Sequence, residues 1–274
     1  AYGYNGVVSS SSSQLFRVDF SHSFIKYCHE NKIIAEFTRF NPILKNQVFS
    51  QYLSVNKMNN NIIVDLTYSE DDIWNNLYEH SVRKNVRKAL RNELTIKIYQ
   101  NNELSESLQN DFKDIYFATL KRNNADNYYY FDDDYFINFI KNINNNGIFC
   151  FTIKNDIPIS CELVTYRNNH AYSFLGGTLS EYYPYRPNDL LKHEIILYLK
   201  NIGVKYFCLG GGQGNDGIYK YKKSFSKLGE TDFYTGSKIY DQETYDYLCK
   251  TWSDNLPVKS DNFSKRLLRY REQA

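Results

Sequence analysis

The spacing of apolar residues along the chain changes character near residue 68. Before that point the pattern is mixed and predicts loops, with the serine run at residues 9–13 as a flexible surface loop. One short buried strand is expected at residues 61–66. Residues 69–92 predict an amphipathic helix, because acidic residues follow Ser69 and apolar residues then recur at nearly helical spacing.

After residue 92 the predicted elements follow a regular order. Apolar runs predict strands at residues 94–99, 148–153, 158–166, 170–177, 204–209 and 233–240. Helices are expected at residues 105–122, 133–145 and 189–201, and a helical basic tail follows the last strand. Three of the strands follow one another without a helix between them, which excludes the alternation of a doubly wound sheet. The order predicts an α+β fold with a mixed sheet.

The composition is that of a globular protein, with 274 residues, 42% of them hydrophobic. This length suffices for one large domain or two ordinary ones. A formal net charge of +2 does not require a nucleic-acid partner, so any anion site must be local. No apolar run is long enough to span a membrane and no signal peptide is visible, so we expect a cytoplasmic protein. Because the sequence starts at Ala1 without methionine, we also expect residues to precede it.

The cysteines and histidines do not form a recognisable metal site. The five cysteines are widely spaced and lack a C-x-x-C pair, so reduced core thiols are expected rather than a disulfide framework or a zinc site. These cysteines are Cys28, Cys150, Cys161, Cys208 and Cys249. No histidine lies at a spacing that indicates nucleophilic catalysis, and His170 and His193 are expected to be structural.

A formal G-x-G-x-x-G stands at Gly212, Gly214 and Gly217, with Asp232 downstream. A dinucleotide-binding fold needs these glycines to open a helix inside a βαβ unit, with further strands afterwards. Only 57 residues follow Gly217, and the segment directly after it is aromatic and basic. We therefore predict a glycine-permitted loop that passes close to a ligand, with a solvated turn and a surface helix as the alternative.

Several stretches together resemble the Fem-type peptidyltransferase (FemABX) branch of the GNAT acyltransferase superfamily, especially relatives in bacterial surface-polysaccharide gene sets. The main stretch is residues 172–227, supported by "RKNVRKAL" at 83–90 and by residues 116–136. "YGYNGVV" and "EFTRFNP", at residues 2–8 and 36–42, look like the first domain of that family. The resemblance covers most of the chain from about residue 65 to residue 236.

The resemblance implies a GNAT-like fold with one complete and one partial GNAT-like domain. Residues 69–240 are expected to form the acyltransferase domain, and residues 1–68 with 241–274 the incomplete first domain. The F-K-x-x-F element of the family falls on Tyr221, Lys222 and Phe225, with tyrosine in place of the first phenylalanine. Lys222 is thereby implied as a catalytic residue that stabilises negative charge on the transferring carbonyl or pairs with a donor phosphate. A surface lysine is the alternative.

Acyl transfer to an amine requires a proton acceptor and donors directed at the carbonyl oxygen. Glu162 stands inside the apolar strand at 158–166, where a lone carboxylate is costly unless it is partnered or functional. We expect Glu162 to act as a general base, directly or through water, with a salt-bridged or edge-exposed glutamate as the alternative. Asp216 is expected beside Lys222 as a third catalytic group. Substrate contacts are expected from Tyr166, Arg122, Tyr221, Phe225, Asn188, Gly211 and Gly212.

Donor phosphates are expected near the start of the helix at residues 189–201. Arg186 places a cation beside the free backbone amides of that helix, which makes a local anion site. Arg83 and Arg87 lie at helical spacing and are also expected to meet phosphates, although a solvated basic face is equally consistent with their pattern.

The resemblance leaves two donors open. An acetyl-coenzyme A site in this superfamily carries a Q/R-x-x-G-x-G/A turn, where this sequence has "EYYPYRPND" at residues 181–189. That departure weakens a coenzyme A interpretation and agrees with the aminoacyl-tRNA donor of Fem-like enzymes. The expected donor is therefore acyl-CoA or aminoacyl-tRNA, with no tightly bound cofactor and no metal.

The preferred hypothesis is an acyltransferase that moves an acyl or aminoacyl group onto an amine of a cell-envelope sugar or peptidoglycan-type precursor. The acceptor is expected to be a small molecule or a lipid-linked sugar, and tRNA is a candidate donor partner. One alternative is an acetyl-CoA-dependent N-acetyltransferase of a nucleotide amino sugar. Another is a non-catalytic module that binds RNA or glycan through its tyrosines and lysines.

Overall fold

The computed structural model describes residues 3–212, 217–255 and 266–271. The chain forms two compact units: a central unit of residues 60–231, and a terminal unit of residues 1–59 and 232–274. The domain boundaries expected from the sequence are 68/69 and 240/241. They differ from those of the structure because two strands each contribute residues to both units. Residues 62–65 of β2 (Ser54–Asp65) pair with β7 (Tyr206–Gly210), and residues 235–239 of β8 (Glu230–Ile239) pair with β1 (Ala35–Arg39).

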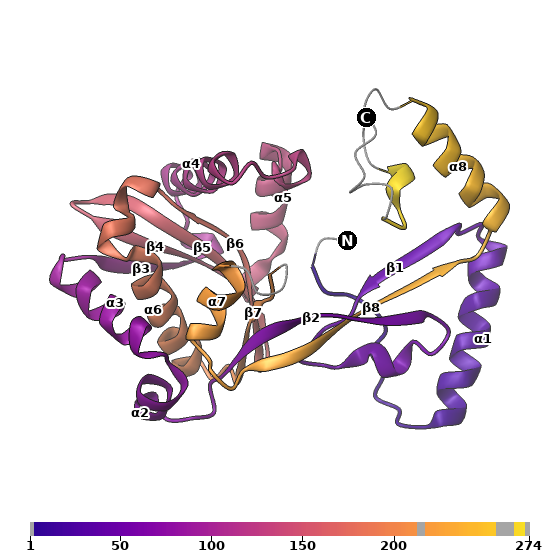
Figure 1. The fold of residues 1–274 in the computed structure, drawn as a ribbon, viewed down its shortest axis with the longest axis horizontal. Helices are drawn as coiled ribbons and strands as arrows, with labels where there is room; N and C mark the ends of the chain where they lie inside the picture. The colour runs from indigo at the N-terminus through magenta and orange to yellow at the C-terminus, as the bar shows by residue number, and fades with distance from the viewer. Residues whose placement is uncertain (1–2, 213–216, 256–265, 272–274) are drawn as a thin grey trace. The chain divides into compact units, whose positions relative to one another are not determined.

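The central unit is built on a mixed sheet with the strand order β2-β7-β6-β5-β4-β3 (Figure 1). Its other strands are β3 (Thr95–Gln100), β4 (Gly147–Lys154), β5 (Ile157–Arg167) and β6 (His170–Thr178). Paired neighbours are antiparallel except β6 and β7, which run parallel. The mixed α/β class predicted from the order of elements is confirmed.

Helices cover both faces of this sheet (Figure 1). On one face, α4 (Glu106–Arg122) packs on β5 and β6, and its Phe112 meets Phe136 of α5 (Asp133–Asn142). On the other face lie α3 (His80–Arg91) and α6 (Pro187–Asn201), with an apolar core beneath them. The helices expected at 105–122, 133–145 and 189–201 are present, with small shifts at their ends.

The single helix predicted over residues 69–92 is wrong. The structure has a short α2 (Glu70–Asp72), a π-helical turn (Ile73–Leu77), an extended Tyr78 and then α3. Backbone groups at the break bond to the end of α7 (Gly217–Ser224) and to the segment after it. Glu79 N donates to Ser224 O at 2.8 Å, and Lys227 N donates to Leu77 O at 3.0 Å. Tertiary hydrogen bonds therefore replace those that a continuous helix would make.

The terminal unit contains a helix that the sequence pattern did not reveal, α1 (Gln14–Glu30). Its only fully buried residues are Ser21 and Cys28, so it lacks a strong apolar stripe. The serine run lies where a loop is expected, and Ser13 caps α1 by accepting from Phe16 N at 3.3 Å. Beyond β1 lies a 3-10 turn (Asn46–Phe49), and the expected helix after β8 is α8 (Gln242–Asn255).

All five cysteines are buried thiols outside any disulfide bond, as the sequence predicts. Among the described residues, no helix is long and apolar enough to cross a membrane.

A glycine in β6 lets α4 approach the sheet closely. A Cβ atom at Gly177 would lie 2.5 Å from Thr119 Oγ1 and 2.7 Å from the carbonyl oxygen of Ile115. Thr119 Oγ1 also accepts a hydrogen bond from Thr178 N at 2.9 Å, so it cannot turn away without losing that bond. The helix is thereby held directly against β6.

We expect Gly177→Ala to lower the free energy of unfolding by about 2 kcal/mol or more, because α4 must move away from the strand. Chemical denaturation measures this value. Gly217→Ala is the matched control, since a Cβ atom there meets no heavy atom of the described residues within 4 Å, and it should change stability by less than about 0.5 kcal/mol. Equal effects of the two substitutions would contradict the close packing of α4.

Candidate functional site

A fork between two parallel strands organises the candidate site. β6 and β7 pair only through residues 170–172 and 206–208, although β6 continues to Thr178 and β7 to Gly210. Both outer neighbours are irregular at the same level: the β5–β6 register shifts between Leu163 and Val164, and the β2–β7 register shifts between Ile62 and Ile63. Beyond the paired segment, no strand of the described part of the chain lies between the facing edges of β6 and β7.

A buried ion pair lies beside this fork. Lys192 of α6 donates to both carboxylate oxygens of Glu162 on β5, with the contact to Oε2 at 2.6 Å. Ser173 of β6 donates to Oε1 at 2.7 Å, and the side chains of Lys192 and Glu162 are only 7% and 10% exposed. The Lys192 Nζ also lies 5.2 Å from the ring centroid of Phe207 on β7. The pair therefore joins α6 to the strands at the fork.

Glu162 therefore forms a salt bridge, which is the first form of the alternative to a general base given in the sequence analysis. This pairing does not decide its catalytic role, because a carboxylate has about four acceptor positions. Lys192 uses one position on each oxygen and Ser173 uses a second on Oε1. The general-base role of Glu162 remains a prediction.

The first turn of α6 carries a second polar network. Asn188 Oδ1 accepts from the hydroxyls of Ser160 and Thr178, with the Ser160 contact at 2.7 Å. Its backbone oxygen accepts from the Tyr221 hydroxyl at 3.0 Å. Asn188, which the sequence predicts to bind substrate, thus links β5, β6 and α7 to the start of α6.

Tyr221 is held in a dry environment. Burial, followed by the negative charges of Asp189 and Glu162, raises the pKa of Tyr221 well above its usual range. Its ring meets Phe225 at 5.3 Å between centroids, and Phe225 in turn meets Tyr78 at 5.5 Å. Phe225 is fully buried, so in this structure it packs behind Tyr221 and does not face solvent.

Lys222 points to the end of β7. Its Nζ donates to the carbonyl oxygen of Gly211 at 2.6 Å. Gly210 has a φ of 74°, and a Cβ atom on Gly211 would lie 2.6 Å from Asn61 Oδ1, so both positions favour glycine. Gly212 follows directly, whereas Asp216 lies outside the described residues. The structure thus brings Lys222 and Gly211 together.

The predicted anion site at Arg186 has a buried carboxylate next to it. Arg186, with a φ of 65°, is the N-cap of α6. Asp189 is buried in the first turn and accepts from Asn85 Nδ2 of α3 at 3.1 Å. Burial raises the pKa of Asp189, while the Asn85 hydrogen bond and the Arg186 charge oppose that rise. The positive charge of Arg186 therefore partly offsets the negative charge of Asp189.

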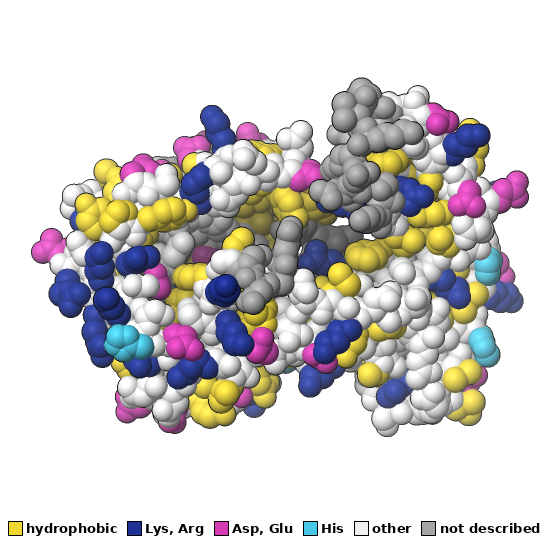
Figure 2. Space-filling model, viewed as in Figure 1, with side chains coloured by type: hydrophobic (Ala, Val, Ile, Leu, Met, Phe, Trp, Pro, Cys, Tyr) yellow, Lys and Arg dark blue, Asp and Glu magenta, His cyan; other side chains and the backbone are white. Residues whose placement is uncertain are grey.

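Arg83 and Arg87 have local partners that the sequence did not reveal. Arg83 Nη1 donates to the backbone oxygens of Trp74, Asn75 and Tyr78 at 3.1, 3.3 and 2.8 Å, which stabilises the break before α3. Arg87 lies 5.4 Å from the Trp74 ring centroid. Figure 2 shows Lys and Arg side chains gathered over α3, in keeping with a basic face, and phosphate binding there remains a prediction.

Tyr166 and Arg122 are the other two side chains that the sequence predicts to contact substrate. Tyr166 stands four residues beyond Glu162 on β5, about 13 Å along the strand, and its hydroxyl meets Gln100 Nε2 at 3.3 Å. Arg122 donates to the carbonyl oxygen of Thr178 at 2.9 Å and lies 5.1 Å from the Tyr183 ring centroid. Arg122 is thus linked to the Asn188 network, whereas Tyr166 is not brought to the fork.

Sequence reasoning missed Lys192, Ser173, Ser160 and Thr178. Lys192 carried a usable signal, because it stands in the apolar run "DLLKHEII" just as Glu162 stands in an apolar strand. The argument that flagged one buried charge therefore applied equally to its partner. The three hydroxyl residues carried no such signal, since serine and threonine are common in strands. Within the described residues, no group of three or more His, Cys, Asp or Glu side chains could hold a metal ion.

The sequence profile of the acetyltransferase (GNAT) domain matches residues 80–223, which is more than half of the chain. The chain therefore belongs to the GNAT acetyltransferase-domain family, and the site residues from Arg83 to Lys222 lie within the matched segment. A comparison with curated proteins found no match.

Solved structures with similar folds include the crystal structure of FemX, with a TM-score of 0.67 at 13% identity over 88% of this chain and 81% of that chain. A second is the C-terminal domain of a putative lysylphosphatidylglycerol synthetase from Agrobacterium fabrum, with a TM-score of 0.58 at 15% identity, covering 80% and 72%. A tandem GNAT protein from the clavulanic acid biosynthesis pathway gives 0.51 at 7% identity, covering 84% and 71%. These similarities concern the fold and are consistent with the FemABX-like branch.

Breaking the ion pair should destabilise the protein strongly. We expect Lys192→Met to lower the free energy of unfolding by about 3–5 kcal/mol, because it leaves the Glu162 charge buried without its partner. The double variant Glu162→Gln/Lys192→Met should recover much of that loss, as measured by denaturant unfolding. Lys223→Met is the control, since its Glu230 partner at 2.6 Å lies at the surface, and it should cost less than about 1 kcal/mol. If the losses of stability in Lys192→Met and in Glu162→Gln, each measured alone, add up to the loss in the double variant, the two side chains are not coupled.

His193 predicts a pH dependence of stability. Its Nδ1 lies 3.2 Å from the Tyr78 hydroxyl, and burial lowers the pKa of His193 to about 4. An unfolded histidine has a pKa of about 6.5, so between pH 6.5 and 4 the unfolded chain binds a proton that the folded protein excludes. Stability should therefore be fully present above about pH 6.5 and fall by roughly 2–3 kcal/mol toward pH 4.

Denaturation series across this pH range test the assignment. His193→Gln should flatten the slope by up to one proton, while His80→Gln, at an exposed position, should leave it unchanged. A slope that persists in His193→Gln would assign the proton uptake to other groups.

Proposed function

We propose that this protein is an N-acyltransferase that moves an acyl or aminoacyl group from a carrier onto an amine of a cell-envelope sugar or peptidoglycan-type precursor. The observation that carries the proposal is the fork between β6 and β7, with the Glu162, Asn188 and Tyr221 networks beside it. Membership of the GNAT family supports acyl transfer, and the FemX-like fold favours the aminoacyl form.

The fork offers backbone groups for an acyl donor. Past residues 172 and 208 the ladder between β6 and β7 ends, and among the described residues no strand pairs with their facing edges. An extended donor segment can bind such an edge as an added strand does. A backbone N–H at the fork would then stabilise the carbonyl oxygen as it becomes negatively charged.

The side chains have complementary roles in this reaction. The amine nitrogen attacks the carbonyl carbon, the bond from that carbon to the carrier breaks, and the amine proton passes to Glu162 directly or through water. That proton later leaves with the released carrier. Lys222 supplies a positive charge beside Gly211, where the donor carbonyl or phosphate would lie. Tyr221 keeps its proton because its pKa is raised, so its hydroxyl remains a hydrogen-bond donor.

Aminoacyl-tRNA is the donor we favour, with acyl-CoA as the alternative. The segment before α6 forms a 3-10 helix, Ser180–Tyr185, whose Tyr182 and Tyr185 pack against the core. It therefore has no glycine-rich turn whose bare amides could cradle a pyrophosphate. One structure of similar fold is described as a putative lysylphosphatidylglycerol synthetase, which supports an aminoacyl donor. Arg186 beside the start of α6 is proposed to meet a donor phosphate of either type.

Mass spectrometry of the acceptor after incubation with each donor tests the proposal. We expect charged tRNA to transfer its aminoacyl group to an amino-sugar nucleotide or a peptidoglycan precursor, whereas acetyl-CoA should give little product. Lys222→Ala and Glu162→Gln should lower kcat about 100-fold or more and change acceptor affinity by less than about threefold.

The matched control is Lys223→Ala, the next residue of α7, which pairs with Glu230 at the surface and should keep normal turnover. Thermal unfolding of Glu162→Gln checks that the loss is catalytic, because this change also leaves Lys192 without its charged partner. Binding of RNA or glycan without transfer from either donor would replace the proposal with a non-catalytic binding module.

A further inference from the structure

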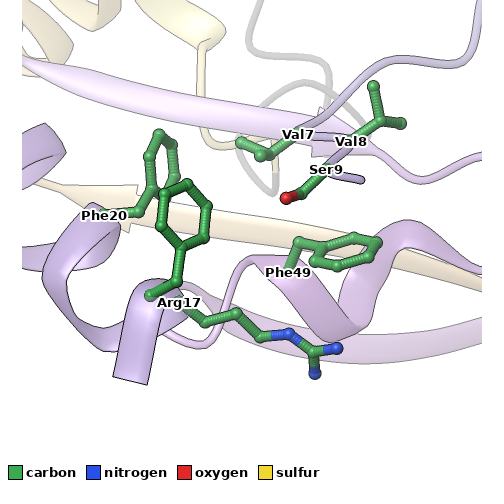
Figure 3. Close-up of a pocket in the computed structure, with 7 residues that line it drawn as sticks. Val7, Val8, Ser9, Arg17, Phe20 and Phe49 are labelled. Atoms are coloured by element: carbon green, nitrogen blue, oxygen red, sulfur yellow. The ribbon is translucent and has the colours of Figure 1, made fainter. Parts of the chain in front are cut away.

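The terminal unit contains a small apolar pocket that is independent of the fork. Its volume is about 180 Å³, and its walls include Phe16 and Phe20 of α1, Phe49 of the 3-10 turn, and Val7 and Val8 of the N-terminal segment (Figure 3). Arg17 is the charged residue in this lining. Sites that enclose a whole small ligand have volumes of about 300–1,000 Å³, so this pocket accommodates one part of a ligand.

The walls of the pocket are fixed by polar contacts on two sides. Asn46, only 1% exposed, donates through Nδ2 to the backbone oxygens of Asn5 and Val7, both at 3.1 Å. Gly6 between them has a φ of 102°, which only glycine adopts without strain. On the other side, Gln14 of α1 donates to Gln51 Oε1 at 3.1 Å. The pocket is therefore preformed rather than a gap between loose loops.

Arg17 carries an unsatisfied donor in this pocket. Its Nε is buried and has no hydrogen-bond partner among the described residues. A buried donor without a partner is unfavourable, so a shift of the guanidinium that brings Nε to an acceptor is favoured. The guanidinium carbon lies 4.8 Å from the Phe49 ring centroid, and Figure 3 shows the side chain extending beneath that ring. An anionic oxygen would balance the charge and, once the guanidinium shifts, would also accept from Nε.

The rim of the pocket is apolar as well. Of the residues that line it, Val8 is 63% exposed and Phe16 is 47% exposed. Apolar side chains that surround an apolar pocket favour a ligand whose chain continues outward over them. A sugar or a free nucleotide would leave these surfaces unpaired, so the geometry selects an aliphatic chain with an anionic group.

We propose that this pocket binds an anionic amphiphile as a single molecule, with its aliphatic chain against Phe16, Phe20 and Phe49 and its carboxylate or phosphate oxygen on Arg17. The shared chemistry fits a free fatty acid, an alkyl phosphate or the lipid part of a larger substrate. This site is separate from the acyltransfer site, and its test does not depend on transferase activity.

Calorimetric titration of the full chain with decanoate and with decyl phosphate, both below their micelle-forming concentrations, measures this binding. Both should bind with one site per chain. Decyltrimethylammonium, which has the same chain and the opposite charge, should bind at least tenfold more weakly, and acetate or inorganic phosphate should show no binding. Phospholipid vesicles form a separate arm: binding only to vesicles would identify a membrane surface and overturn the single-molecule site.

Three variants localise the ligand. Arg17→Gln should weaken the binding of both anions at least fivefold and remove the preference over the cationic amphiphile. Val8→Trp, at an exposed position on the pocket wall, should fill the cavity and abolish chain binding. Arg39→Gln is the matched control, since Arg39 also lies near an aromatic ring, Phe233 at 5.8 Å, but outside the pocket.

Thermal unfolding midpoints establish that each variant is folded, and Val8→Trp carries the test if Arg17→Gln is not. Equal affinity of Val8→Trp and the unaltered protein would overturn the proposal, as would equal binding of anionic and cationic amphiphiles.

Discussion

The ion pair between Glu162 and Lys192 is the constraint on which the arrangement of the candidate site depends. Two charges removed from water are stable only when each finds the other and further polar contacts satisfy the remaining groups. Here Ser173 supplies such a contact, and the pair lies where β6 leaves β7. The requirement to keep the charges together therefore fixes α6 against β5 and β6 at the level of the fork.

Helix α6 connects the ion pair to the rest of the site through the contacts of four of its residues. Asn188 bonds to hydroxyls of β5 and β6, Asp189 to Asn85 of α3, Lys192 to Glu162, and His193 to Tyr78 at the break before α3. Because residues three or four apart share one helical face, a stretch of less than two turns reaches several elements at once. A rotation of α6 would break all of these contacts together, so the site is positioned as a whole.

The glycines show how a sequence pattern and a structural requirement can differ. The formal G-x-G-x-x-G begins at Gly212, yet the positions with a demonstrable need for glycine are Gly210, with its positive φ, and Gly211, which approaches Asn61. At Gly217, the other end of the motif, a Cβ atom would meet none of the residues that the structure describes within 4 Å. The chain leaves β7 through Gly210, and the carbonyl oxygen of Gly211 then accepts a hydrogen bond from Lys222.

The order of strands and helices, the mixed sheet class and the GNAT resemblance could be read from the sequence, because apolar periodicity and local end signals depend on neighbouring residues. The sequence also identified Glu162 and Lys222 as unusual. Only the tertiary structure decided that Lys192 pairs with Glu162, that Phe225 is buried behind Tyr221, that Tyr166 lies away from the fork, and that the helix expected at 69–92 breaks at Tyr78. Each of these outcomes depends on contacts between residues far apart in the chain. Local propensity carries no information about such contacts, since the partners are determined by packing and by the pairing of buried polar groups.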